Sequence, residues 1–303
     1  MTDVLKPETS AATEAADPSG PTETRLGIRK TYKLYVGGAF PRTESGRYDP
    51  LMLADGEVVN VSRASRKDVR EAVVKARAAQ GGWAHRSAYN RAQILYRIAE
   101  MLEGRRRQFE EELASIEPES DARAEVSATI DAIVYWAGWC DKFQQTFSAV
   151  NPVASSHFNF SVLEPTGVVT VVAPQRAGLF GLVQSATPAV VTGNSVLALA
   201  SAESPLSAIT LGEVLESSDV PPGVFNFLTG RRDELLAPLA SHRDVNAIVY
   251  CGNDVEEIRV VQTEATANLK RVALRSDPLP GTFDPYWMLD TCEVKTTWHP
   301  IGT

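Results

Sequence analysis

The chain has 303 residues, of which 44% are hydrophobic and 22% are charged, a length that can form one large core or two ordinary ones. Its 30 basic and 38 acidic side chains give a net charge of −8, which argues against general nucleic-acid binding. Three scattered cysteines exclude a disulfide framework, no stretch approaches the ~18 apolar residues of a membrane helix, and the N-terminus lacks the pattern of a signal peptide. We therefore expect a protein of the reducing cytoplasm.

The first 26 residues are rich in Thr, Ala, Glu, Ser and Pro and contain few apolar side chains. Such a segment cannot bury enough surface to offset its ordering entropy, so residues 1–26 are predicted to be a disordered arm.

Folded sequence begins near Tyr32, where YKLYVGG predicts an edge strand or hairpin. Ser65 and Asp68 form a capping-box pattern that starts a first helix, and a second, longer helix begins near Ser87. That second helix is predicted to include the arginine run 105–107, whose charges we expect to pair with glutamates one turn away rather than with phosphate. A third helix is predicted over residues 123–146.

From residue 157 the pattern changes to strands. Apolar runs at 168–172, 195–200, 224–228 and 246–250 alternate with helical windows at 179–191, 205–217, 233–241 and 254–266. Continuous apolar strands separated by helices predict an α/β fold with a doubly wound parallel sheet covered on both faces.

The sequence contains neither G-x-G-x-x-G nor a Walker-type phosphate loop. Gly230 and Gly252 each follow a predicted strand, where a phosphate could approach the backbone, but lone glycines there are usually turn residues. Asp254 and the two glutamates after it would repel a phosphate beside Gly252. The three cysteines have no histidine near them and the four histidines have no ligand spacing, so no catalytic residue and no metal site is predicted.

Several segments occur in the order found in one enzyme family: YVGGAF, SRKDVREAVVKARAA, YWAGWCDKF, EPTGVVTVVAP, ATPAVVTGNSVLALASAESPLSA, PPGVFNFLTG, LASHRDVNAIVYCGN and NLKRVAL. On these segments the chain resembles the NAD(P)-dependent aldehyde dehydrogenase superfamily from about Tyr32 to Leu274. The resemblance implies a Rossmann-like cofactor domain with N-terminal helices, a protruding antiparallel bridging hairpin at about 150–163 and a C-terminal strand.

The resemblance also implies which positions would contact NAD(P), here in a degenerate site. These positions are Pro174, Gln175, Arg176, Leu199, Ala202, Gly230, Arg232, Gly252 and Asn253. Leu199 stands where the family has a lysine for the adenosine ribose or phosphate, and Ala202 stands where NAD-preferring members have an acidic residue. Arg232 replaces a small residue that would admit the cofactor. We therefore expect no cofactor to bind tightly, although the family uses NAD(P).

The catalytic groups differ in the same way. Arg176 stands where the family's asparagine donates to the oxyanion, and Arg275 stands where the family has its general-base glutamate. After residue 276 no counterpart of the catalytic domain follows. Residues 277–290 are rich in Pro and Gly and are interpreted as a linker in its place, and residues 291–303 resemble the family's C-terminal oligomerisation strand.

The resemblance therefore divides the chain into a disordered arm (1–26), a cofactor-type domain (27–276), a linker (277–290) and an oligomerisation strand (291–303). The residues expected to mediate assembly are Phe158, Phe160, Glu293, Val294, Lys295, Thr296 and Trp298.

Three functions remain open. The first is a non-catalytic subunit that assembles with a full-length aldehyde dehydrogenase, and the loss of several catalytic groups favours it. The second is an NAD(P)-dependent oxidoreductase that works only with a catalytic domain from a partner chain. The third is a regulatory module in which Arg176, Arg231 and Arg232 bind an anionic metabolite or nucleotide.

Overall fold

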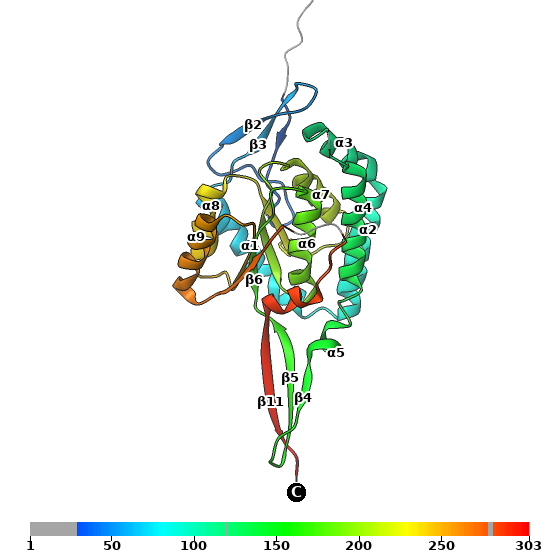
Figure 1. Ribbon diagram of the computed structural model, residues 1–303, viewed down its shortest axis with the longest axis vertical. Helices are drawn as coiled ribbons and strands as arrows, with labels where there is room; N and C mark the ends of the chain where they lie inside the picture. Colours follow the sequence, from blue (N-terminus) through cyan, green and yellow to red (C-terminus); the bar gives the residue numbers. More distant parts are fainter. Residues whose placement is uncertain (1–28, 119, 278–280, 303) are drawn as a thin grey trace, which may run out of the picture.

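The computed structural model describes residues 29–118, 120–277 and 281–302. The predicted disordered arm at 1–26 lies outside these residues. Figure 1 shows an α/β body from which a long antiparallel sheet projects at one end.

The body is built on a five-stranded parallel sheet with the strand order β10-β9-β6-β7-β8. Its strands are β6 (Val168–Val172), β7 (Ser195–Leu199), β8 (Phe225–Leu228), β9 (Ala247–Cys251) and β10 (Arg271–Arg275). The four strands predicted from apolar runs lie within one residue of their predicted positions, and the doubly wound α/β fold is confirmed.

Helices cover both faces of this sheet (Figure 1). One face packs against α6 (Gly178–Val191) and α7 (Leu206–Glu216). The other packs against α1 (Arg66–Ala84), α8 (Arg232–Ser241) and α9 (Val255–Ala265). The strands alternate between the two cores, as in β6, where Val169 and Val171 face α6 and Val168 and Val172 face α1.

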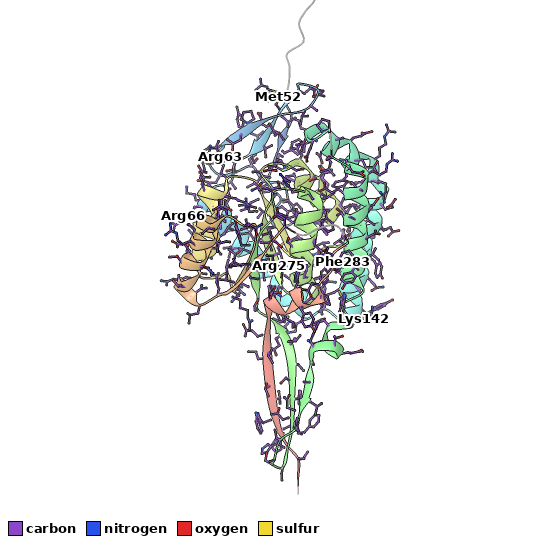
Figure 2. The ribbon with its side chains drawn as sticks, in the orientation of Figure 1. Met52, Arg63, Arg66, Lys142, Arg275 and Phe283 are labelled. Atoms are coloured by element: carbon purple, nitrogen blue, oxygen red, sulfur yellow. The ribbon has the colours of Figure 1, made fainter. Side chains whose placement is uncertain are left out.

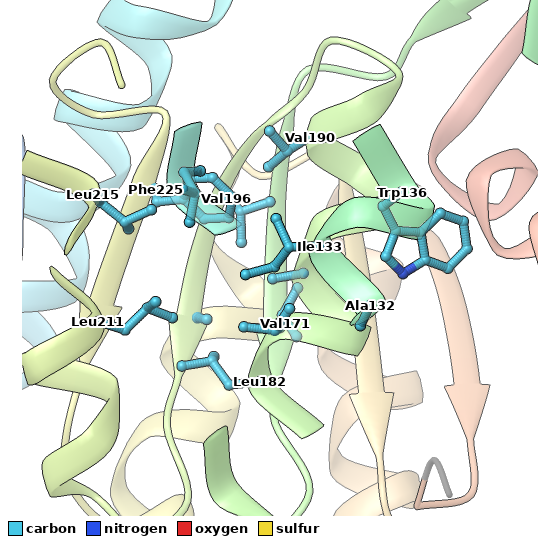
Figure 3. Close-up of a cluster of buried hydrophobic side chains, with 14 of the residues drawn as sticks. Ala132, Ile133, Trp136, Val171, Leu182, Val190, Val196, Leu211, Leu215 and Phe225 are labelled. Atoms are coloured by element: carbon cyan, nitrogen blue, oxygen red, sulfur yellow. The ribbon is translucent and has the colours of Figure 1, made fainter. Parts of the chain in front are cut away.

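The N-terminal helices form a further layer outside α6. They are α2 (Ala88–Gly104), α3 (Arg106–Ile116) and α4 (Ala122–Ala137). Figure 3 shows Ile133 and Trp136 of α4 in one cluster with Leu182 of α6 and the sheet strands. The predicted N-terminal signals are confirmed: Ser65 and Asp68 form a capping box on α1, and Ser87 caps α2.

Two predicted helices are interrupted. The second helix ends at Gly104, and Arg105, with a ψ of 11°, separates it from α3, where the predicted pairing of Arg107 with Glu111 occurs at 2.6 Å. The predicted helix over 123–146 stops at Ala137, because Gly138 caps α4 and a turn precedes the short α5 (Phe143–Phe147). Glycine has a low helix propensity, which favours this break.

The predicted first strand is also shorter than its pattern suggests. Only β1 (Thr31–Tyr32) belongs to a sheet, with β2 (Tyr48–Met52) and β3 (Val58–Ser62), while Tyr35 forms an isolated bridge to Phe227.

The projecting sheet consists of β4 (Ala149–Asn151), β5 (His157–Pro165) and β11 (Cys292–Pro300), and we call it the tongue. β11 pairs antiparallel with β5 along its whole length, from Cys292 opposite Pro165 to Pro300 opposite His157. The predicted hairpin and the predicted C-terminal strand are therefore neighbours, as Figure 1 shows.

The predicted linker differs from a free spacer. Residues 281–291, which we call the strap, contain the 3₁₀ helix η2 (Pro285–Thr291) and pack against α6. Met288 is fully buried in the main core, so tertiary packing orders a segment that has no periodic pattern. In the part of the chain that the structure describes, no helix is both long and apolar enough for a membrane span.

Candidate functional site

The strand order identifies the crevice where an open α/β sheet binds ligands. From β6 the chain continues to β7 and β8 on one side and then returns to β9 and β10 on the other. The topological switch point therefore lies between β6 and β9, at the carboxyl ends of these strands.

The guanidinium of Arg232 fills this crevice. Its Nη2 atom donates to the carbonyl oxygen of Ala173, which follows β6, and to that of Cys251 at the end of β9, the latter at 3.3 Å. Only 12% of the side chain is exposed, and its Nε atom is buried without a partner among the described residues. One arginine thus bridges the two strands between which a ligand would enter.

Two further side chains hold Arg232 in place. Its Nη1 atom donates to Glu257 Oε2 at 2.9 Å, and the Tyr250 hydroxyl donates to the same oxygen at 2.6 Å. Burial and this hydrogen bond raise the pKa of Tyr250 above its ordinary value, so the phenol remains a donor to Glu257. The crevice therefore contains a neutralised arginine–glutamate pair rather than a free cation.

The backbone donors around the crevice are also occupied. Asp254 caps α9 and accepts from the N–H groups of Glu256 and Glu257 at 2.9 Å. The α6 N-terminus is capped by Glu125 of α4, which accepts from Leu179 at 2.9 Å. Burial raises the pKa of Glu125, while these backbone hydrogen bonds lower it. At both helix ends a carboxylate occupies the place that suits a phosphate.

The two glycines at the crevice adopt backbone conformations that other residues rarely adopt. Gly230 and Gly252 have φ values of +153° and +150°. A Cβ on Gly252 would lie 2.8 Å from the Tyr250 hydroxyl oxygen, and the Gly252 N–H donates to the Arg275 carbonyl at 2.9 Å. Both glycines therefore act as turn residues, as their patterns favoured.

Two of the other residues predicted by resemblance, Ala202 and Gly230, line one hollow beside the β2–β3 hairpin. Leu199 is fully buried in the core on the α1 face, whereas Ala202, Asn253 and Arg176 are exposed. Pro174 is buried, and Gln175 accepts from the Ala202 N–H at 2.9 Å, which joins the loop after β6 to the loop after β7. Arg232, between the ends of β6 and β9, fills the place where the fold predicts a dinucleotide, and the crevice with this side chain in it does not fit that group.

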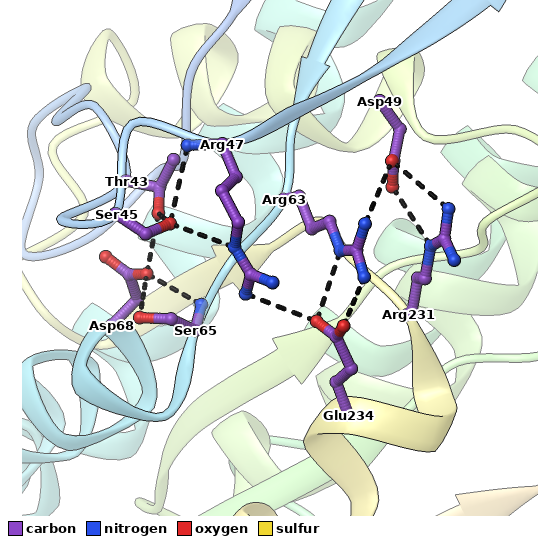
Figure 4. A network of polar contacts seen from close by, with 9 residues as sticks. All are labelled: Thr43, Ser45, Arg47, Asp49, Arg63, Ser65, Asp68, Arg231 and Glu234. Atoms are coloured by element: carbon purple, nitrogen blue, oxygen red, sulfur yellow. Dashed lines mark hydrogen bonds and ion pairs between the residues drawn. The ribbon is translucent and has the colours of Figure 1, made fainter.

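Arg231 points away from the crevice into a surface network of charges (Figure 4). Its Nη2 atom lies 3.3 Å from Asp49 Oδ1, and Asp49 also pairs with Arg63. Glu234 in the first turn of α8 pairs with Arg63 and with Arg47. This network joins the β2–β3 hairpin to α8, so Arg231 and Arg232 do not form one anion site together.

Arg275, where the resemblance places the family's general base, lies next to the η2 segment of the strap (Figure 2). Its Nη2 atom donates to Asp290 at 2.6 Å and to the Trp287 carbonyl at 3.1 Å, and its guanidinium carbon lies 4.4 Å from the centre of the Trp287 ring. Only 7% of its side chain is exposed. A buried guanidinium with these partners is a structural group and cannot accept a proton.

The cysteines are not activated. Burial raises the pKa of the Cys251 thiol, raises that of Cys292 to about 11 and raises that of Cys140 to about 12. A nucleophilic thiol needs a lowered pKa and access to substrate, and these three have neither. Within residues 29–118, 120–277 and 281–302, no cluster of His, Cys, Asp or Glu side chains suits a metal ion.

The residues predicted to mediate assembly lie on the tongue, on both of its faces. The register places Phe158, Phe160 and Val150 on one face, and Val294 and Trp298 on the other. The side chains of Val150, Val294 and Trp298 are 57–67% exposed, and that of Phe158 is 44% exposed. Two of the predicted residues also have partners within the chain: Glu293 pairs with Arg271 at 3.0 Å, and Thr296 contacts the Ser161 hydroxyl at 2.9 Å. Lys295 is exposed.

Sequence reasoning missed the partners that define the crevice. Glu125, Glu257 and Tyr250 lie on separate elements, and only the fold brings them to Arg232 or to α6. The one available signal was the acidic first turn of α9, which indicated that a carboxylate, and not a phosphate, completes that helix end.

Comparison with known proteins identifies the family. Residues 43–281 match the family model "Aldehyde dehydrogenase family". The chain is 31% identical over 263 residues to the mouse cytosolic 10-formyltetrahydrofolate dehydrogenase, covering 82% of this chain and 29% of that protein. It is 30% identical over 259 residues to the putative aldehyde dehydrogenase DhaS of Bacillus subtilis, covering 82% of this chain and 50% of that protein. The chain thus spans half or less of the length of these relatives.

Solved structures agree with this assignment. PnpE from Pseudomonas sp. WBC-3 superposes with a TM-score of 0.75 at 26% identity, over 82% of this chain and 50% of that one. A structure of PnpE in complex with nicotinamide adenine dinucleotide gives a TM-score of 0.76 at 25% identity, again over 82% and 50%. From the matched residues and the shared fold, the chain belongs to the aldehyde dehydrogenase family.

Proposed function

We propose that this chain is a non-catalytic subunit that assembles with a full-length aldehyde dehydrogenase. The observation that carries the proposal is the pairing of β5 with β11. The chain retains a complete tongue, although only residues 276–291 separate β10 from β11. By resemblance, the tongue of one family subunit lies on the catalytic domain of its neighbour. The described residues contain such a donor element, and the proposal is that the other subunit supplies the acceptor domain.

The altered crevice supports the non-catalytic part of the proposal. Arg232 lies between β6 and β9, and Arg275 replaces a general base with a group that remains charged. NAD(P), the cofactor of the family, is therefore proposed to bind weakly or not at all.

The alternative of an anion-binding regulatory module has less support. Arg231 and Arg232 each already pair with a carboxylate, and a third arginine alone is a weak attraction for an anion. An oxidoreductase completed by a partner's catalytic domain would need a general base where Arg275 stands. Three free cysteines are consistent with the cytoplasm as the proposed compartment.

Co-purification tests the proposed assembly. The tagged chain is co-expressed with the full-length aldehyde dehydrogenase of the same cell, and we expect the two proteins to elute together. Phe158→Asp places a charge on the apolar face of the tongue and should abolish co-elution. Tyr89→Asp is the matched control, because Tyr89 is also an exposed aromatic residue, at 70%, but lies on α2. Loss of the partner with both variants, or with neither, would contradict assembly through the tongue.

A further inference from the structure

The strap begins where the match to the family ends. The family model covers the chain up to residue 281, and residues 281–291 then lead to the start of β11. Phe283, labelled in Figure 2, belongs to this segment and lies against Tyr135 of α4. The strap thus lies between the end of the family match and β11.

Polar and aromatic contacts fix the first end of the strap. Gln184 of α6 donates from Nε2 to the Thr282 carbonyl at 2.8 Å, and Trp136 donates to the same glutamine at 2.9 Å. The Phe283 ring stacks on Tyr135 of α4 with a centroid distance of 4.4 Å and an interplanar angle of 17°. These contacts bind the strap to α4 and α6 together.

The second end of the strap is fixed at the base of the tongue. The Thr291 carbonyl accepts from the Thr166 N–H at 3.1 Å and from Asn194 Nδ2 at 2.9 Å. The next residue, Cys292, is the first of β11 and pairs with Pro165. The strap therefore determines where β11 enters the tongue.

Between these ends, one ion pair joins the strap to the sheet. Arg275 and Asp290 lie 2.6 Å apart, and their side chains are 7% and 38% exposed. Both Nε and Nη1 of Arg275 are buried without hydrogen-bond partners among the described residues. Asp290 is thus the one carboxylate that compensates this buried charge within hydrogen-bond distance in the described part of the chain.

We infer that the strap stays packed over Arg275 as a permanent part of the α/β body. The Arg275–Asp290 ion pair is the positioning contact that holds the strap there. A partner cannot dock on the surface over Arg275 without displacing the strap. This inference does not depend on the proposed assembly, because it concerns contacts within one chain.

Arg275 is buried whereas Asp290 is partly exposed, and this difference makes the inference testable. Removing Asp290 leaves a buried charge unpaired, whereas removing Arg275 leaves a carboxylate that can reach water. Asp290→Ala, or the milder Asp290→Asn, should therefore open the strap more than Arg275→Met does. Glu256→Ala is the matched control, because Glu256 and Arg259 also lie 2.6 Å apart but are more than 70% exposed.

The readout is maleimide labelling of each cysteine in the folded protein, mapped by mass spectrometry. Cys251 pairs with Arg275 across the sheet, and Cys292 follows the strap. Cys140, in the turn between α4 and α5, is the internal reference. We expect Asp290→Ala to increase labelling of Cys251 and Cys292 about tenfold or more, with Cys140 unchanged. Unchanged labelling of Cys251 and Cys292 in both Asp290 variants would overturn the inference. An equal rise at Cys140, or an equal effect of Glu256→Ala, would overturn it as well.

Discussion

At the scale of single residues, Arg232 distinguishes this crevice from an open ligand site. Its guanidinium bonds to the strand ends on both sides of the switch point and to Glu257. A buried arginine with several charge-assisted hydrogen bonds stabilises the fold, whereas an exposed ion pair contributes little.

Substituting Arg232 tests this difference. Arg232→Ala should lower the free energy of unfolding by about 2 kcal/mol, since hydrogen bonds to charged groups contribute about 1.5–3 kcal/mol. Arg231→Ala should cost less than about 0.5 kcal/mol, because Arg231 is 52% exposed. Denaturant unfolding measures both values. Equal losses of unfolding free energy in the two variants would contradict a stabilising role of the buried Arg232.

Cofactor affinity is the second property that depends on these residues. Calorimetric titration should detect no NAD binding to the unaltered chain at micromolar concentrations. Arg232→Ala alone should not restore tight binding, because Leu199 and Ala202 still lack the groups that the resemblance places there. A micromolar dissociation constant for the unaltered chain would show that the crevice accepts the cofactor with Arg232 in place.

Lys270 should make the stability of the fold depend on pH. The residue is 8% exposed, and burial lowers the pKa of its ammonium from 10.5 to about 8. Between these values the unfolded chain binds more protons than the folded chain, so stability should rise as pH increases from about 8 to 10.5. Lys270→Met should remove this rise in thermal unfolding measurements.

Lys142→Met is the control for that prediction. Lys270 donates to the His242 carbonyl at 2.8 Å, and Lys142 likewise donates to the Gly138 carbonyl at 2.6 Å, but Lys142 is exposed. A pH profile that is unchanged by Lys270→Met, or changed equally by Lys142→Met, would contradict the assignment to Lys270.

At the scale of elements, the proposed assembly and the folding of the α/β body depend on different parts of the chain, because the tongue projects from the body. Deleting residues 292–303 removes β11 but leaves the parallel sheet and its helices complete. The truncated chain should keep its circular dichroism spectrum and bind a full-length aldehyde dehydrogenase more weakly, because β5 then lacks its long antiparallel partner.

A shorter truncation serves as the control. Removing residues 301–303 preserves β11 through Pro300 and should leave partner binding unchanged. Equal binding by the long deletion and the intact chain would contradict the assignment of β11 to assembly.

The four predicted strands of the parallel sheet and the helices that follow them could be predicted from sequence to within one residue. The strands at 168–172 and 246–250 are continuous apolar runs, and a buried parallel sheet imposes that pattern. The break after Ala137 and the packed strap could not be predicted so directly. Phe283 and Met288 are held by side chains far away in sequence, and no local periodicity reports such contacts.

The candidate site could be predicted only in part, because the partners of its key residues also lie far away in sequence. Position by position, the resemblance identified Arg232 and Arg275 as departures from the family. It did not indicate that backbone carbonyls, Glu257 and Asp290 would neutralise them, because those partners come from other elements. That both arginines are buried and structural could be seen only once the fold was known.

At the scale of the whole molecule, the altered crevice and Arg275 predict that the isolated chain is inactive. Purified protein should form no NADH above the blank with short-chain or aromatic aldehydes. The chain has no cysteine with a lowered pKa and no general base at Arg275. Aldehyde-dependent NADH formation that persists after removal of contaminating dehydrogenases would contradict this.

Native mass spectrometry tests the proposed assembly most directly. The chain is co-expressed with the full-length aldehyde dehydrogenase of its own cell, and the purified material is measured intact. The proposal predicts peaks whose masses contain both chains, and their loss when residues 292–303 are deleted. Spectra that show only the free 32.9 kDa chain beside an assembly of the full-length enzyme alone would contradict it.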